Sequence, residues 1–247
     1  MKRFFILIVY LISNLFLNSA IAQDDLKTAE AKDTKKDTKT FKIISLDGKN
    51  EKVTITPDYV GKVLTITCLE SKISIPDFWG VFPEIRILNK NFIELTYAVR
   101  GGSNIGLGNT LIVCVSHNKL CVAIHVLNHS SFDAGDEKDN YHIKLVLNGS
   151  NDNNYRLNVS IHDNVISKPN PEISYNYNNE TVLSFDNKKD VFYSIKESIH
   201  NYYIVPKGGK KQKISGNYPI VFLGKETYYF INNKWYQPES SEKMSEF

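Results

Sequence analysis

The chain has 247 residues, of which 30 are lysine or arginine and 27 are aspartate or glutamate, which gives a formal net charge of +3 at pH 7. A composition of 42% hydrophobic and 12% aromatic residues is enough for a packed core, which excludes a wholly disordered chain. Binding to nucleic acid usually requires a strongly basic surface, and a net charge of +3 is too small to provide one, so we expect no nucleic-acid partner.

Residues 1–22 have the organisation of a secretory signal peptide. Lys2 and Arg3 precede an apolar run, and the segment ends on Ala-Ile-Ala, the small-residue pattern of a cleavage site. The apolar run is broken by Ser13 and Asn14 and is shorter than the roughly 20 residues that cross a bilayer. We therefore expect export to the periplasm or the extracellular space, and no transmembrane span after cleavage of the signal.

Two polar segments flank the part that is predicted to fold. Residues 23–40 carry five acidic and five basic side chains with almost nothing apolar. They cannot bury enough surface to offset the entropy cost of ordering, so we interpret them as a flexible charged tether. Residues 238–247 are also polar and are predicted to form a disordered tail, which leaves residues 41–237 for an all-β domain.

Short β-prone runs separated by turn residues dominate this domain, and no long apolar repeat has a helical period. Asn89-Lys90 and Asn232-Asn233 are among the dipeptides that stand where hairpin turns should be. One or two turns of helix are the alternative for residues 194–201. The predicted strands are 41–46, 51–56, 62–70, 84–88, 92–99, 110–116, 119–127, 141–147, 155–162, 181–185, 191–195, 202–205, 220–223, 227–231 and 234–237.

This pattern predicts an all-β fold, either an antiparallel β-sandwich or a barrel-like stack of hairpins. Two prolines within residues 167–171 would interrupt strand pairing, so a boundary between two small β modules would lie there if the domain is divided. A plain surface loop is the alternative interpretation.

The segment from Tyr141 to His162 allows a hairpin register to be written down. Pairing Leu147 with Tyr155 across the intervening loop places the apolar side chains of both strands on one face. His142 and His162 then lie on the opposite, exposed face, diagonally offset from each other. Metal binding there would need a third ligand that the sequence does not supply, so we predict no metal site and no cofactor.

An exported protein meets an oxidising compartment, which makes its three cysteines informative. With His117-Asn118 as a tight turn, Cys114 lies directly opposite Cys121, with Cα atoms about 4.5 to 5.5 Å apart. A disulfide bond can bridge this separation, and two buried free thiols are the alternative. Cys68 is interpreted as a core residue.

Residues 100–109 form a glycine-rich stretch between two predicted strands. Successive backbone amides in such a stretch can form an anion-binding nest, in which Arg100 would carry the anion. The spacing fits neither a dinucleotide-binding nor a Walker motif, and those motifs open a helix rather than join two strands. A flexible hairpin loop is the alternative.

The C-terminal hairpin carries aromatic residues on both faces. In the predicted register Phe230 faces Trp235 on one side. Tyr229 faces Tyr236 on the other side. One face must pack on the core, and the other is either covered by Tyr202 and its neighbour or exposed as a flat platform for a sugar or a partner protein. The candidate ligand-binding residues are therefore Tyr229, Trp235, Tyr236 and Arg100.

No catalytic residues can be named, because the chain has neither a Gly-x-Ser-x-Gly elbow nor a cysteine-protease signature. The signal peptide, the tether and the aromatic hairpin instead indicate a ligand- or protein-binding module, secreted or associated with the envelope, whose partner is a glycan or an envelope protein. The alternative is a secreted hydrolase with an active site assembled from loops.

Overall fold

Nearly all of the regular secondary structure that the computed structural model describes is β-strand, which confirms the predicted fold class. The structure describes residues 37–149, 154–240 and 242–247, so the predicted signal peptide and most of the predicted tether lie outside the described residues. No helix among those residues is long and apolar enough to cross a bilayer. The strands are β1 (Lys39–Ile44), β2 (Asn50–Asp58), β3 (Val63–Cys68), β4 (Ser71–Pro76), β5 (Phe78–Leu88), β6 (Phe92–Val99), β7 (Ile105–Ser116), β8 (Lys119–Asp133), β9 (Glu137–Asn148), β10 (Arg156–Ser167), β11 (Tyr175–Asp186), β12 (Val191–Tyr193), β13 (Ile195–Val205), β14 (Gln212–Leu223), β15 (Glu226–Ile231), β16 (Lys234–Pro238) and β17 (Lys243–Glu246), and a short 3-10 helix, η1 (Pro171–Ile173), follows β10.

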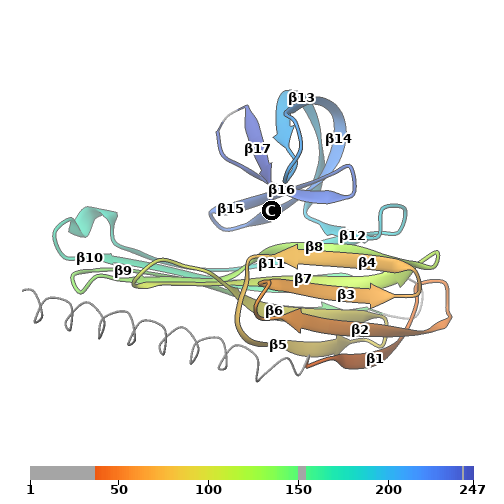
Figure 1. Cartoon of the computed structure of the whole chain (residues 1–247). Helices are drawn as coiled ribbons and strands as arrows, with labels where there is room; N and C mark the ends of the chain where they lie inside the picture. Colours follow the sequence, from red (N-terminus) through yellow and green to blue (C-terminus); the bar gives the residue numbers. More distant parts are fainter. Residues whose placement is uncertain (1–36, 150–153, 241) are drawn as a thin grey trace, which may run out of the picture. The chain divides into compact units, whose positions relative to one another are not determined.

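The strands form three hydrogen-bonded systems within the described residues (Figure 1). β1 to β4 make a four-stranded sheet, β5 to β12 make an eight-stranded sheet, and β13 to β17 close into a small barrel. Within each system, strands that are neighbours in sequence pair in antiparallel fashion, and the barrel closes through the parallel pairing of β13 with β17. Antiparallel hairpins need only short connections, which suits a chain so rich in turn residues.

The four-stranded sheet packs on one face of the larger sheet. Leu111, Val113 and Val115 of β7 join a buried cluster with residues of β1 to β4. Ile112 and Cys114 belong to a second cluster on the opposite face, which includes side chains of β9 to β12 and of the barrel. Because the second half of β7 is buried on both faces, its sequence from Leu111 to Val115 is a continuous apolar run rather than an alternating one.

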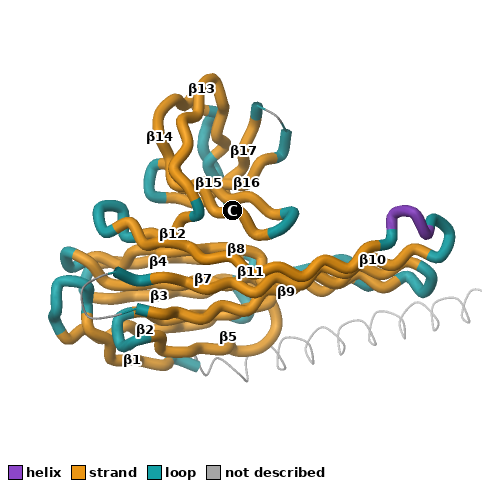
Figure 2. Tube along the Cα trace, turned by 180° about the vertical axis from the view of Figure 1, so that it is seen from behind, coloured by secondary structure: helices purple, strands orange, loops and turns teal. Residues whose placement is uncertain are grey.

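β9, β10 and β11 run side by side to the loop that contains η1 (Figure 2). β9 and β10 keep the alternating pattern of a sheet with one solvated side. Leu145 and Val159 are buried, whereas their neighbours Lys144 and Ser160 are exposed.

The predicted register of the β9–β10 hairpin is wrong by two residues. Leu147 pairs with Leu157 rather than with Tyr155, and His142 pairs directly with His162 instead of lying diagonally from it. The faces are nevertheless as predicted, because a shift by two residues returns each side chain to the same side of the sheet.

Two segments that lie mostly outside the predicted strands are parts of the barrel. Residues 195–201 belong to β13 rather than to a helix, and β13 pairs with β14. The described part of the predicted disordered tail contains β17, whose Met244 is buried in the barrel core. Backbone pairing with β13 and β16 orders this segment although its side chains are mostly polar.

The structure also defines the extent of two segments that were interpreted as possible loops. Residues 167–171 lie at the end of β10 and in the loop with η1 that joins β10 to β11, two strands that pair with each other. The glycine-rich stretch is a loop only over residues 100–104, because Gly106 and Gly108 belong to β7. A Cβ atom at Gly106 would lie 2.6 Å from Ser131 Oγ, so this glycine permits the close approach of β8.

Candidate ligand-binding cleft

A cleft of about 820 Å³ lies among β4, β6 to β8 and the barrel strands β16 and β17. The loop after β6 contributes Arg100 to the cleft. The aromatic hairpin, which consists of β15 and β16, contributes Trp235. Folding thus brings together two of the four candidate ligand-binding residues, which are far apart in the sequence. Ile75, Leu111 and Val122 add apolar surface to the walls.

His125 lies half-buried in the lining of this cleft. Its Nε2 atom is 2.6 Å from the Tyr97 hydroxyl, and its ring packs edge-on against Phe247 with 4.7 Å between ring centroids. Burial lowers the pKa of His125 to about 3, and the nearby Lys207 acts in the same direction. Burial also raises the pKa of Tyr97. Both side chains are therefore neutral near pH 7, and they place one uncharged polar contact in a lining of mixed polar and apolar residues.

Positive charges without carboxylate partners line the same cleft. Lys72, Arg100 and Lys207 take part in none of the ion pairs found within the described residues. Lys234, the fourth cation of the lining, forms an ion pair with Glu246 at 2.9 Å. Asp77 is the other carboxylate of the lining. Cations thus exceed carboxylates, so the cleft is suited to an anionic group.

Both faces of the aromatic hairpin are covered. Trp235 is only 3% exposed, and its Nε1 donates a hydrogen bond to the Val122 carbonyl at 3.2 Å. Tyr236 lies in the barrel core, against which Tyr202 and the half-buried Tyr229 pack. Of the two predicted arrangements, the one with a covered second face is observed. Tyr229 and Tyr236 are therefore not brought to the cleft.

Cys114 and Cys121 are directly opposed across β7 and β8, in the register that the tight turn predicts. The turn residues His117 and Asn118 have positive φ angles of 50° and 62°, as a two-residue hairpin turn requires. All three cysteines, including the buried Cys68, are free thiols in this structure. The hydrogen bond between the opposed thiols raises the pKa of Cys114 and lowers that of Cys121. The disulfide bond between them stays a prediction.

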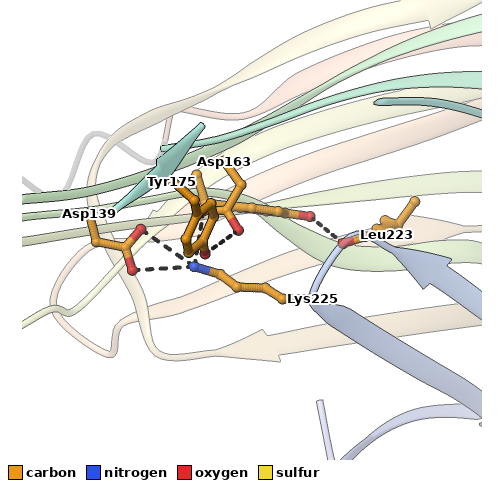
Figure 3. Close-up of polar contacts among 6 residues, drawn as sticks. Asp139, Asp163, Tyr175, Leu223 and Lys225 are labelled. Atoms are coloured by element: carbon orange, nitrogen blue, oxygen red, sulfur yellow. Dashed lines mark hydrogen bonds and ion pairs between the residues drawn. The ribbon is translucent and has the colours of Figure 1, made fainter. Parts of the chain in front are cut away.

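A second polar cluster joins the turn after β14 to the strands β9 to β11 (Figure 3). The Lys225 Nζ atom lies 3.2 Å from a carboxylate oxygen of Asp139 and 3.2 Å from one of the buried Asp163. The Tyr175 hydroxyl donates a hydrogen bond to the other oxygen of Asp163 at 2.9 Å. Desolvation lowers the pKa of Lys225, but the hydrogen bonds to both aspartates outweigh this effect and the net shift is upward. Because the lysine and the tyrosine hydroxyl hold both aspartates within the fold, we interpret the cluster as a structural contact, although one negative charge is left over.

The solvated face of β9 to β11 holds the histidine pair. The ring centroids of His142 and His162 are 4.8 Å apart, and Nδ1 of His162 is 2.5 Å from the side-chain oxygen of Asn178. Within the part of the chain that the structure describes, no three histidine, cysteine, aspartate or glutamate side chains are grouped so that they could hold a metal ion.

No protein-family model, curated protein or solved structure matches this chain. The cleft is therefore assigned from its geometry alone. Neither His125 nor Tyr97 stood out in the sequence. A signal for His125 existed, because it interrupts the apolar run between Ile124 and Val126, but nothing in the sequence links it to Tyr97 on another strand.

Proposed function

We propose that this chain is an exported binding module whose cleft takes a small ligand with an anionic group and an apolar or aromatic body. One observation carries the proposal, the meeting of Arg100, Lys207 and Trp235 around the neutral contact between His125 and Tyr97. The two cations attract the anionic group. The apolar walls of the cleft receive the rest of the ligand.

The two partner classes suggested by the sequence, a glycan and an envelope protein, fit this proposal in modified form. The aromatic platform expected for them is covered, because Trp235 and Tyr236 are both buried. We therefore propose that an acidic sugar or an acidic side chain of a partner is bound at the cleft. Secretion or a periplasmic location belongs to the same proposal, because a ligand from outside the cell must reach the cleft.

A loop-built hydrolase is the competing proposal. A hydrolytic histidine would be expected to face a serine or cysteine nucleophile. The hydrogen bond of His125 goes to the Tyr97 phenol instead, and the buried environment keeps the imidazole from accepting a proton. This geometry supports binding more than catalysis.

The proposal is tested with a matched pair of fluorescent probes, anilinonaphthalene sulfonate and the neutral N-phenylnaphthylamine, which lacks the sulfonate. We expect the folded protein to bind the sulfonate more tightly than the neutral probe. Arg100→Gln and Lys207→Gln should each weaken sulfonate binding about fivefold, as expected for the loss of one favourable charge contact. Binding of the neutral probe should change little.

Lys144→Gln is the control for this experiment, because Lys144 is exposed on β9 and does not line the cleft. It should bind both probes like the wild type. Equal affinity for the two probes, or sulfonate binding that is insensitive to Arg100→Gln and Lys207→Gln, would contradict the proposal.

A further inference from the structure

Apolar side chains are exposed together at one end of the sandwich formed by β1 to β8. Val60, in the turn between β2 and β3, is 86% exposed, and Val81, in β5, is 81% exposed. Tyr59 and Trp79, which adjoin them, are exposed as well. Single exposed apolar side chains are ordinary on a protein surface, but a group of them at one place indicates an interaction surface.

An irregularity in β5 holds Val81 outward. The pairing of β5 with β6 skips residues 80–83, which oppose a single residue of the partner strand. Gly80 has a φ of +89°, a conformation that glycine adopts without strain. Such a bulge protects the edge of a sheet from pairing with other chains. Edge protection does not explain the exposure of Val60, which lies on the other sheet.

Direct contacts hold the two exposed segments together. The Phe78 amide donates a hydrogen bond to the Lys62 carbonyl at 3.1 Å. The rings of Tyr59 and Phe78 lie 5.8 Å apart. Two cations, Lys62 at 4.7 Å and Arg100 at 5.6 Å, lie over the Trp79 ring. Apolar tips, amphipathic rings and cations thus form one surface.

We propose that this surface docks the protein onto an anionic phospholipid bilayer. The loop-end patch, as we call it, consists of Tyr59, Val60, Lys62, Trp79, Val81 and Arg100. Val60 and Val81, which are almost fully exposed, enter the boundary of the acyl chains. Tryptophan and tyrosine favour the depth of the lipid headgroups. Lysine and arginine at the same depth meet the lipid phosphates.

The charges at this end set how strongly docking depends on anionic lipid. Lys39, over the Phe82 ring at 4.1 Å, adds a third cation. Asp58 and Asp77 lie at the same strand ends, and Asp58 accepts a hydrogen bond from the Gly61 amide at 2.8 Å. The carboxylates offset part of the positive charge. Insertion of apolar groups therefore supplies most of the affinity, and the anionic lipid adds a smaller, salt-sensitive part.

Sedimentation with lipid vesicles tests the proposal. The protein should bind vesicles of phosphatidylcholine mixed with phosphatidylglycerol about threefold to tenfold more tightly than vesicles of phosphatidylcholine alone. The Val60→Ser and Val81→Ser double variant should bind at least about tenfold more weakly, because it loses two apolar insertions. Binding should also shift the Trp79 fluorescence to shorter wavelength, since Trp79 is the exposed one of the two tryptophans.

The double variant Ile173→Ser and Val182→Ser is the matched control, because these side chains are exposed on η1 and β11, away from the patch. It should bind vesicles like the wild type. Failure of the wild-type protein to bind mixed vesicles, as expected if the patch docks another protein, would overturn the proposal. So would equal binding by both double variants. Arg100 belongs to both the patch and the cleft, but Val60 and Val81 do not line the cleft, so the Val60→Ser and Val81→Ser variant should bind the sulfonate probe like the wild type.

Discussion

At the scale of single residues, folding changes the chemistry of His125 strongly. The ring lies against Phe247 and beside the Tyr97 hydroxyl, and burial lowers its pKa to about 3. An unfolded histidine has a pKa near 6.5. Below that pH the unfolded chain binds a proton that the folded chain does not, so the free energy of unfolding falls as the pH is lowered from about 6.5 towards 3.

We predict that His125→Gln removes this part of the pH dependence. Carboxylates titrate in the same range, so the informative quantity is the difference between the two proteins. Between about pH 7 and pH 4.5 the free energy of unfolding of the wild type should fall by about 1 to 3 kcal/mol more than that of the variant. Because the His125 ring is only half-buried, we expect a difference below the upper end of this range. Denaturant unfolding at each pH measures it. Parallel profiles for the two proteins would contradict the assigned burial of the imidazole.

At the scale of elements, Lys225 is the main polar connection between the β14–β15 turn and the strands beneath it. Lys225→Met keeps most of the side-chain volume but leaves the buried Asp163 without its cation. Because the lysine is 35% exposed, we expect a loss of about 1 to 2 kcal/mol in the free energy of unfolding rather than the larger cost of breaking a fully buried pair. Lys144→Met, on the solvated face of β9, should cost much less. Similar losses for both variants would mean that the cluster does not stabilise the fold.

The elements also show what the sequence could predict. Alternation of apolar and polar residues assigned the correct faces to β9 and β10, but alternation repeats every two residues, so it could not separate the pairing of Leu147 with Tyr155 from the observed pairing with Leu157. The turn at His117-Asn118 fixed its own register, because a two-residue turn leaves only one pairing. β17 was missed because its order comes from backbone partners in β13 and β16 rather than from its own side chains.

At the scale of the whole molecule, the cleft depends on contacts that no local pattern encodes. Arg100 follows β6, His125 lies in β8 and Trp235 lies in β16, so the site exists only after the barrel has packed on the larger sheet. The sequence could identify Arg100 and Trp235 as unusual residues within their segments. Their meeting is set by the shared core in which Phe230 and Tyr228 of the barrel pack with the sheet.

The shared core predicts that the barrel and the sheets unfold together. Trp235 is buried in that core and donates a hydrogen bond to the Val122 carbonyl of β8. Trp79→Phe leaves Trp235 as the single tryptophan, so its fluorescence reports on the junction between the barrel and the sheet. In this variant we expect the fluorescence and the far-ultraviolet circular dichroism to change at one denaturant concentration. Two separate transitions, with the fluorescence changing first, would show that the barrel is an independent domain, and the cleft would then open before the sheets unfold.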